Sequence, residues 1–461
     1  MNKSVLGIDL GTSSVKILQK FQSGEVVKSR ASYEEIGPRG WWSAICHALE
    51  QLELDDVEGI SLSSQVGTYI VNGKDVISWN DGAGAEELKA VKGMYGQEIF
   101  LKEISMPHPN IVSYPIPRLQ YIKGHYEKIE SICQPKDFIC EQLTGKRITD
   151  PYSWRGLANL EKKEYSRYFL NELEIDVHTL PEMADFTDLA GYTKELLLDE
   201  KMLPAGIPVY IGLNDYYASL LGMGVQSDGD LFDISGTSEH VGVIQKELNT
   251  DTELVCGPYL NENVHYGVTA SSGASIKFGM KIVENLTFDL EKIRKSHPPI
   301  FLPYLKGERA PIWNPDARGV YFGIEEGCTK EELAYAAMEG VVFSLYHIYE
   351  TMGSPMTKSM KVSGGAAIIP ILNQLKAEMF DLPLDVLEEN DTSALGAAVI
   401  AALKSGWYEN FSEAIEKNCN VKERIYPVKE HREWMLGRYK IYKELYPALQ
   451  LQYEKLKELK T

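Results

Sequence analysis

The chain has 461 residues, 44% hydrophobic and 25% charged, which is typical of a globular protein of two or three domains. Its 66 acidic and 47 basic residues give a formal net charge of -19, which argues against nucleic acid or an anionic membrane surface as the main partner. Six scattered cysteines without a CxxC pair indicate reduced thiols rather than a disulfide framework. A strand expected from Val5 leaves no room for a signal peptide, and the longest apolar run, 394–403, is too short to span a bilayer. We therefore expect a cytoplasmic protein.

The first predicted element is a β-hairpin at the N-terminus. Residues 5–10 form a buried strand, residues 15–18 an outgoing strand, and Gly11 between them allows a turn with positive φ. Thr12 and Ser13 gather hydroxyl and backbone N–H groups in this turn. A turn of this kind can wrap its N–H groups around a phosphate.

Two charged residues flank this turn. Asp9, near the end of the incoming strand, can reach Mg²⁺ through water. Lys16 either meets the terminal phosphates or is a solvated strand lysine. An ordinary hairpin with a turn-capping aspartate remains the plainer interpretation of these residues alone.

The next strands run into polar loops, where open α/β sheets place their ligands. After a helix over 41–52, a strand over 60–63 leads to Gln65, and another over 76–79 leads to Trp79-Asn80-Asp81. Residues 84–145 are expected to be mainly helical.

Asp215 lies between a predicted strand over 208–212 and a helix that begins near 218. A carboxylate at such a junction is well placed for chemistry. Its plainer alternative is a helix N-cap.

A second hairpin, over 231–243, repeats the pattern of the first about half a chain later. An apolar strand leads into Asp233-Ile234, followed by Gly236-Thr237-Ser238 and a second apolar strand. Two halves with one phosphate hairpin each imply a nucleotide held between them. We expect domains over 1–226 and 227–461.

The second half continues with helices and glycine-containing loops. Ser271 to Ala274 precede a helix, Thr329 to Glu332 form a capping box that opens a long helix through Met352, and Ser363 to Ala367 precede another helix. A small-residue helix begins at Ala394. A tail helix at about 430–446 carries Met435, Tyr439, Tyr442 and Tyr446 on one face and is expected to pack on a domain.

Taken in order, these motifs resemble the FGGY family of carbohydrate kinases. The two hairpins match its phosphate hairpins, Gly212-Leu213-Asn214-Asp215 its catalytic motif, and residues 307–323, beginning Gly307-Glu308-Arg309-Ala310-Pro311, its signature loop. Ser363-Gly364-Gly365-Ala366 with Asn373-Gln374 matches the adenine-side loop and helix. The resemblance implies an α/β fold of two ribonuclease-H-like domains, as in actin and Hsp70, with the active site in the cleft between them.

The resemblance also implies roles for individual residues. Asp215 is expected to be the catalytic base, and Asp9 to bind Mg²⁺, the cofactor of ATP, through water. Gln65 and Asp81 are expected to bind sugar hydroxyls, and Trp79 either stacks on the sugar or packs in the core. The expected nucleotide- and phosphate-binding residues are Gly11, Thr12, Ser13, Lys16, Gly236, Thr237, Ser238, Gly273, Gly364, Gly365, Ala366 and Asn373. The expected substrate-binding residues are Gln65, Trp79, Asn80, Asp81 and Asp215. Arg309 and Arg318 act either as charged ligands or as loop-stabilising residues.

Departures from the family pattern concern the sugar loops. Val66-Gly67 replaces the Met-His of the xylulokinase-like branch, Ala83 replaces a usual arginine, Tyr216 a common asparagine, and Pro117-Arg118-Leu119 fits a further signature poorly. A less positive, roomier pocket favours a neutral ketose such as xylulose. A heptulose such as sedoheptulose, gluconate and glycerol are the alternatives.

Two other functional classes remain open. One is a non-kinase ATPase of the actin or Hsp70 type, and the other is a sugar sensor without catalysis. The expected partners are a small sugar and ATP, with no nucleic acid or membrane, and the resembled family suggests a homodimer.

Overall fold

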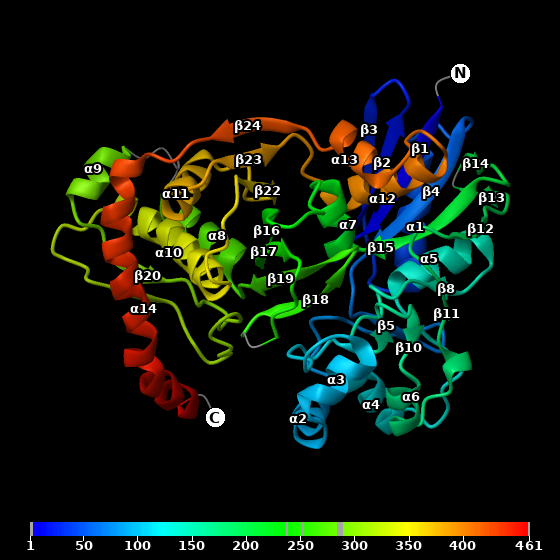
Figure 1. Ribbon diagram of the computed structural model, residues 1–461, viewed down its shortest axis with the longest axis horizontal. Coiled ribbons are helices and arrows are strands. Elements are labelled where there is room, and N and C mark those ends of the chain that lie inside the picture. Colours follow the sequence, from blue (N-terminus) through cyan, green and yellow to red (C-terminus); the bar gives the residue numbers. More distant parts are fainter. Residues whose placement is uncertain (1–2, 199, 237, 251–252, 284–288, 460–461) are drawn as a thin grey trace. The chain divides into compact units, whose positions relative to one another are not determined.

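The chain separates into two units in the computed structural model, which describes residues 3–198, 200–236, 238–250, 253–283 and 289–459 (Figure 1). Unit 1 comprises Met1–Gly224 and Asp391–Cys419, and unit 2 comprises Val225–Asn390 and Asn420–Thr461. These units differ from the expected domains, 1–226 and 227–461, mainly in the segment 391–419. That segment returns to unit 1 because its helix α12 (Thr392–Lys404) packs against the first strand of the chain.

A six-stranded sheet with the order β12-β15-β4-β1-β2-β3 forms the centre of unit 1. Its strands are β1 (Ser4–Leu10), β2 (Ser14–Phe21), β3 (Val26–Ser32), β4 (Val57–Ser64), β12 (Leu189–Tyr192) and β15 (Pro208–Asn214). β1, β4 and β15 are parallel neighbours, whereas β2, β3 and β12 pair antiparallel. The carboxyl ends of three parallel strands therefore meet at one edge of this sheet.

Helices and short strands surround this sheet. The helices of unit 1 are α1 (Pro38–Glu50), α2 (Ala85–Met94), α3 (Gln97–Ile104), α4 (Pro115–His125), α5 (Pro135–Thr144), α6 (Arg167–Glu172), α7 (Asp215–Gly222), α12 and α13 (Phe411–Asn418), with a 3₁₀ turn over Val177–Thr179. The short strands are β5 (Tyr69–Val71), β6 (Asp75–Ile77), β7 (Ile132–Cys133), β8 (Ile148–Thr149), β9 (Ala158–Asn159), β10 (Glu164–Tyr165), β11 (Glu182–Met183), β13 (Leu196–Leu197) and β14 (Met202–Leu203).

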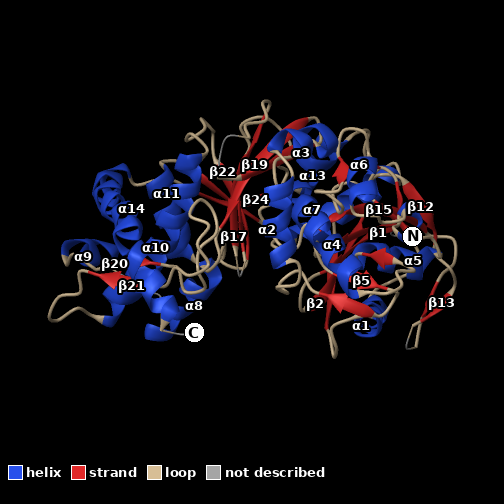
Figure 2. Ribbon diagram, turned by 90° about the horizontal axis from the view of Figure 1, so that it is seen from below, coloured by secondary structure: helices blue, strands red, loops and turns tan. Residues whose placement is uncertain are grey.

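Unit 2 repeats the same strand arrangement. Its seven-stranded sheet has the order β18-β19-β17-β16-β22-β23-β24, and Figure 2 shows these strands in red. The strands are β16 (Leu231–Ser235), β17 (Glu239–Gln245), β18 (Val255–Tyr259), β19 (Glu262–Val268), β22 (Met360–Gly364), β23 (Leu384–Leu387) and β24 (Val421–Ile425). β16 pairs antiparallel with β17 and parallel with β22, as β1 does with β2 and β4. The two units thus share one topology, as the repeated hairpin predicts.

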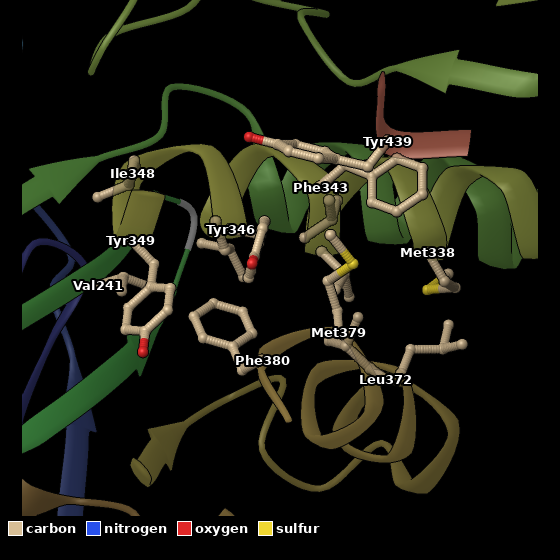
Figure 3. Packing of buried hydrophobic residues seen from close by; sticks show 14 of the residues in the cluster. Val241, Met338, Phe343, Tyr346, Ile348, Tyr349, Leu372, Met379, Phe380 and Tyr439 are labelled. Atoms are coloured by element: carbon tan, nitrogen blue, oxygen red, sulfur yellow. The ribbon is translucent and has the colours of Figure 1, made fainter. Parts of the chain in front are cut away.

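The core of unit 2 lies between its helices and its sheet. The helices are α8 (Ser272–Ile282), α9 (Leu290–Lys295), α10 (Lys330–Thr351), α11 (Pro370–Phe380) and α14 (Lys429–Glu458), and a small sheet joins β20 (Ile300–Leu302) and β21 (Val320–Phe322). Tyr346 of α10 stands edge-on to Phe380 of α11, with ring centroids 5.4 Å apart (Figure 3). Tyr439 packs on Tyr346 and Phe343, so α14 covers this core. The helix is longer than the predicted 430–446.

Close backbone contact fixes α7 against α12 in unit 1. A Cβ atom on Gly396 would lie 1.9 Å from the carbonyl oxygen of Ala218, and one on Gly222 would lie 2.0 Å from that of Thr392. Glycine at these positions is therefore required by space rather than by backbone conformation. The predicted small-residue helix packs as its composition indicates, and it buttresses the helix that begins with Asp215.

Most elements predicted from the sequence are present near their expected bounds. The capping box at Thr329 opens α10, and Gly145 ends α5 in the left-handed conformation. One expectation of backbone conformation is wrong, since Gly11 does not have a positive φ; its N–H instead closes the hairpin on the carbonyl of Ser14 at 3.1 Å. Within the described residues, no helix is both long and apolar enough to cross a membrane.

Candidate active site

The first hairpin presents its turn residues to solvent. Thr12 and Ser13 are exposed between β1 and β2, while Tyr33 donates a 2.9 Å hydrogen bond to the carbonyl of Gly11 and fixes the turn. The hydroxyls of Thr12 and Ser13, which are expected to bind phosphate, therefore lie in an exposed turn.

Lys16 has a specific partner in unit 1. Its Nζ lies 2.7 Å from Oδ1 of Asp391, the residue before α12, and Lys28 approaches the other oxygen of Asp391 at 3.3 Å. The alternative of a solvated strand lysine is thus replaced by an ion pair that ties β2 to α12. Much of the positive charge of Lys16 is balanced by this carboxylate.

Asp9 is buried at the end of β1. Its Oδ1 accepts a 2.9 Å hydrogen bond from Ser63 of β4, and its Oδ2 a 2.6 Å bond from Ser393 of α12. Desolvation raises the pKa of the Asp9 carboxyl despite these bonds and the nearby charge of Lys16. Asp9 is therefore held in one orientation by two neighbouring elements.

Asp215 is the first residue of α7, directly after β15. The N-cap of this helix is Asn214, whose Oδ1 accepts the N–H of Tyr217 at 3.1 Å, so the capping alternative for Asp215 is wrong. Oδ1 of Asp215 accepts the N–H of Tyr216 at 2.8 Å. Desolvation, with the negative charge of Asp9 second, raises the pKa of Asp215 to about 7.

Strand register explains why these carboxylates are neighbours. Asp9 stands opposite Ser63 on β4, and Asn214 of β15 stands opposite Ser64 on the other side of the same strand. The next residue, Gln65, is anchored by its N–H to the carbonyl of Leu10 at 2.9 Å. Asp9, Gln65 and Asp215 thus gather at one edge of the sheet.

Gln65 carries an unsatisfied buried acceptor. Its side chain is buried, and its Oε1 has no hydrogen-bond partner within the part of the chain that the structure describes. Burying an amide oxygen without a partner costs free energy, and a bound hydroxyl would satisfy it.

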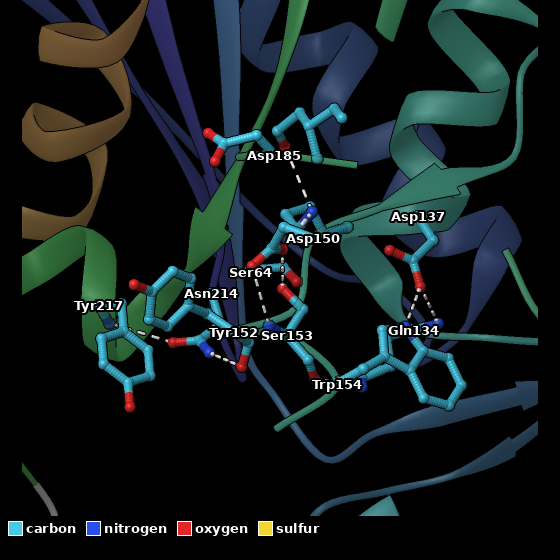
Figure 4. A network of polar contacts seen from close by, with 12 residues as sticks. Ser64, Gln134, Asp137, Asp150, Tyr152, Ser153, Trp154, Asp185, Asn214 and Tyr217 are labelled. Carbon is cyan, nitrogen blue, oxygen red and sulfur yellow. Dashed lines mark hydrogen bonds and ion pairs between the residues drawn. The ribbon is translucent and has the colours of Figure 1, made fainter. Parts of the chain in front are cut away.

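Buried polar contacts involve the loop after β4 and the start of α7, and Figure 4 shows those of Asn214 with Tyr152 and Tyr217. Gln134 accepts the N–H of Gly67 at 3.0 Å and donates to the carbonyl of Ser153 at 2.6 Å. Asn214 donates to the carbonyl of Tyr152, next along the same segment, at 2.8 Å. The loop after β4 and the start of α7 are therefore held by neighbouring residues of one segment.

The Trp79-Asn80-Asp81 turn lies beside the first hairpin. Trp79 is half-buried and donates from its indole nitrogen to the hydroxyl of Thr12 at 3.3 Å, so it is not enclosed in the core. Asn80 and Asp81 are accessible at the surface, and Oδ1 of Asp81 accepts the N–H of Ala83 at 2.8 Å.

A fully buried arginine lies beneath this turn. Nη2 of Arg118, on α4, donates to the carbonyls of Ser78 and Asp81, each at 2.8 Å. The sequence did not assign this residue a function, although a guanidinium among the apolar neighbours Ile116 and Leu119 could have signalled one. The guanidinium of Arg118 therefore holds the backbone of this turn from within the fold.

In unit 2, the second hairpin is bonded to the glycine loop after β22. Ser235 donates from its hydroxyl to the carbonyl of Ser363 at 2.8 Å and accepts the N–H of Ala366 at 2.9 Å. A Cβ on Gly364, whose φ is 89°, would lie 2.1 Å from the carbonyl oxygen of Ser235. Gly236 and Ser238 of the hairpin therefore share one edge with Gly364, Gly365 and Ala366; Thr237 lies outside the described residues.

The remaining predicted nucleotide residues occupy the helices next to this edge. Asn373, in α11, is buried and donates to the carbonyl of Ala367 at 2.7 Å, which shapes the loop from within. Gly273 is half-buried in the first turn of α8.

A buried charge cluster supports the hairpin from below. Nζ of Lys376, on α11, bonds the carboxylates of Asp233 and Glu239, and Ser272 donates to Glu239. Burial, with the charge of Glu239 second, raises the pKa of Asp233. These residues, which the sequence did not predict, tie both strands of the hairpin to the helix after the glycine loop.

Comparison with known protein families identifies the family of this chain. The profile of the FGGY family of carbohydrate kinases, N-terminal domain, matches residues 4–222, and that of the C-terminal domain matches residues 232–405. The chain belongs to the FGGY family of carbohydrate kinases. An FGGY kinase is an ATP-dependent sugar kinase, in agreement with the activity that the sequence predicts.

Individual members of the FGGY family match this chain over nearly its full length. The xylulose kinase of Staphylococcus xylosus is 28% identical, with 96% of this chain and 99% of that protein covered. The structure of a ligand-bound xylulose kinase from Lactobacillus acidophilus superposes with a TM-score of 0.85 at 22% identity, covering 98% of this chain and 100% of that one. A gluconate kinase from the same organism gives a TM-score of 0.84 at 22% identity, covering 99% of this chain and 100% of that one. The fold is thus that of the FGGY kinases, and it does not distinguish the sugar.

Proposed function

We propose that this kinase transfers the γ-phosphoryl group of ATP to a terminal hydroxyl of a ketose, with xylulose-like pentuloses preferred. The observation that carries the proposal is the position of Asp215 at the carboxyl end of β15, beside Asp9 and Gln65. The full-length similarity to xylulose kinases supports the choice of acceptor.

Asp215 acts as the base in the proposed reaction. The acceptor hydroxyl donates a hydrogen bond to its carboxylate, and the hydroxyl oxygen forms a bond to the γ-phosphorus while the bond from that phosphorus to the bridging oxygen of ADP breaks. The hydroxyl proton passes to Asp215, and ADP leaves with the electron pair. Because the transition state of phosphoryl transfer is loose, positioning supplies most of the catalysis and the proton moves late.

Asp9 fits a hydrated Mg²⁺. The described residues contain no group of three or more His, Cys, Asp and Glu side chains suited to direct metal binding. Each oxygen of Asp9 accepts one serine hydroxyl, which leaves a lone pair for a metal-bound water. When bound, Mg²⁺ neutralises phosphate charge, and Asp9 holds it through water.

The phosphates and the adenine are bound by the residues predicted for them. Thr12 and Ser13 of the first hairpin offer exposed hydroxyl groups to terminal phosphate oxygens, and Gly236 and Ser238 are the phosphate-binding residues predicted in the second hairpin. The loop of Gly364, Gly365 and Ala366 approaches the nucleotide closely because two of its residues lack a side chain. Asn373 shapes that loop, and Gly273 follows Ser272, which donates to Glu239 of the second hairpin.

The sugar is bound by side chains at the same edge of unit 1 as Asp215. Gln65 offers its unpaired Oε1 to a hydroxyl, Asp81 and Asn80 offer accessible polar groups, and Trp79 covers the C–H face. A ketose provides hydroxyls for all of them, whereas glycerol would leave part of this set unpaired.

An acceptor screen tests the proposal. We expect ADP release with xylulose and a lower kcat/KM with sedoheptulose. With gluconate and glycerol, kcat/KM should be about tenfold or more below the value for xylulose, because these acceptors pair less completely with the sugar-binding side chains. A lead of about tenfold for gluconate or glycerol would overturn the choice of acceptor and leave the kinase assignment intact. ATP turnover that no sugar accelerates would instead favour a non-kinase ATPase, and sugar binding without turnover would indicate a sensor.

Location and assembly are part of the same proposal. We place the protein in the cytoplasm, supported by six scattered cysteines without a CxxC pair. A homodimer, suggested by the family resemblance, is tested by light scattering of the purified protein.

A further inference from the structure

Arg309 of the signature loop reaches the second phosphate hairpin. Its Nη1 lies 3.5 Å from Oγ of Ser238, and both residues belong to unit 2. The contact is long for a hydrogen bond. It places the guanidinium beside the hairpin and leaves its other N–H groups available to a ligand.

The backbone around Arg309 is firmly held. Oε1 of Glu308 accepts the N–H groups of Arg309 and Ala270 at 2.8 and 2.7 Å, and Oε2 accepts the hydroxyl of Ser344 at 3.0 Å. The N–H of Ala310 donates to the carbonyl of Val268 at 3.1 Å. The guanidinium therefore projects from a loop that is fixed to β19 and α10.

The guanidinium of Arg309 has no ion pair with a carboxylate among the residues that the structure describes, although the side chain is half-buried. The nearby Glu308 carboxyl is directed to backbone N–H groups and a serine hydroxyl instead, and burial raises its pKa to about 7. By contrast, Lys16 at the first hairpin is paired with Asp391. His240, in strand β17 of the second hairpin, adds no charge, because desolvation and the charge of Arg309 lower its pKa to about 4.

A half-buried guanidinium without a paired carboxylate indicates an anionic ligand. Its planar set of five N–H donors suits the oxygens of a phosphate, and such charge-assisted bonds are stronger than neutral ones. Gly236 and Ser238 offer further donors at the same edge. An anion bound there would contact both the hairpin and Arg309.

We propose that Arg309, together with Gly236 and Ser238, binds the phosphate chain of the nucleotide. Its guanidinium supplies positive charge to the phosphates, whereas the charge of Lys16 is balanced by Asp391. The inference deepens the proposed function, on which it rests. Arg309 is thereby a nucleotide-contacting residue, and removing it is expected to weaken binding of di- and triphosphates selectively.

A series of adenine ligands tests this role without any sugar. Affinities of the full-length protein for adenosine, AMP, ADP and a non-hydrolysable ATP analogue are measured by calorimetry for wild type, Arg309→Gln and Arg309→Lys. Arg309→Gln should lose about tenfold or more for ADP and the analogue, and less than about twofold for adenosine, because a charge-assisted bond is removed. Arg309→Lys should recover part of the loss, and the salt dependence of ADP affinity should be shallower in Arg309→Gln.

Arg318→Gln is the matched control in the same loop. Nη1 of Arg318 donates to the carbonyls of Pro315 and Ala317 at 2.8 and 2.7 Å, so its role is to hold the loop. It should leave the ratio of ADP to adenosine affinity unchanged, even if the melting temperature falls. Equal weakening of all four ligands by Arg309→Gln, or no weakening, would overturn the role of Arg309 as a phosphate ligand.

The two proposals fail in different ways. If the wild-type protein phosphorylates no sugar but Arg309→Gln selectively loses ADP, the acceptor assignment fails and the role of Arg309 stands. If the wild-type protein phosphorylates a ketose and Arg309→Gln binds ADP normally, the role of Arg309 fails alone.

Discussion

Asp9 and Asp215 stand at the carboxyl ends of two strands, β1 and β15, that flank the same central strand, β4. The pairing places two acidic groups close enough for the charge of one to raise the pKa of the other. One of them is tied down by two serine hydroxyls, and the other begins a helix. This asymmetry suits a fixed metal-side carboxylate and an acceptor-side base.

Replacing Asp215 by alanine should abolish phosphoryl transfer. Loss of a general base typically lowers kcat by about 10²–10⁴-fold. Affinity for Mg·ATP should change only a few-fold, because the carboxylate faces the acceptor hydroxyl. Steady-state ADP release and calorimetry with an ATP analogue measure the two quantities, and a variant that keeps a tenth of the wild-type kcat would exclude Asp215 as the base.

The pH profile should report the raised pKa of Asp215. Since the base must be ionised, kcat/KM should fall as pH drops through about 7, the pKa of Asp215 in the free protein. Asp9→Asn should move this midpoint to lower pH, because it removes a negative neighbour that disfavours ionisation. A midpoint that stays in place in Asp9→Asn would show that the two carboxylates do not interact.

Arg118→Met should raise the KM for the sugar about tenfold, since both carbonyls that hold the Trp79-Asn80-Asp81 turn lose their donor. Arg118→Lys, which can reach one carbonyl, should recover part of the affinity. The KM for ATP and the melting temperature are measured beside it. If both KM values rise together, Arg118 supports the fold in general and not the sugar turn.

Gly396→Ala should destabilise unit 1 by about 1–3 kcal/mol, the usual cost of overpacking, because the new methyl group would meet the carbonyl oxygen of Ala218. Gly437→Ala is the matched control. Gly437 is exposed in α14, and a Cβ atom there would have nothing within 4 Å, so alanine should stabilise the helix by about 0.5–1 kcal/mol. Denaturant unfolding measures both, and a neutral Gly396→Ala would contradict the close packing of α7 on α12.

Local sequence signals predicted the parts of the fold that depend on local chemistry. The two hairpins, the junction at Asp215 and the capping box at Thr329 each carry turn or capping residues at fixed spacing, and each is present. The pairing of Lys16 with Asp391 joins residues far apart in the chain, and no local pattern encodes it. The same holds for Ser393 on Asp9 and for Lys376 beneath the second hairpin.

Two arginines for which a role is proposed could not be interpreted from the sequence alone. Arg118 lies among apolar neighbours, and the family pattern fits poorly there, so its contact with the turn became visible only with the fold. Arg309 was recognised as a candidate charged ligand. The proposal for it rests on its approach to Ser238 and on the absence of a carboxylate partner among the described residues.

The return of residues 391–419 to unit 1 has a consequence for biosynthesis. Ser393, which bonds Asp9, and α12, which covers β1, leave the ribosome only after the preceding residues, up to Asp391, have emerged. The amino-terminal half therefore cannot complete its own sheet packing during the early part of translation. A gene truncated near residue 226 would yield a fragment in which α12 does not cover β1 and α7. The apolar surface exposed there would be a binding site for chaperones.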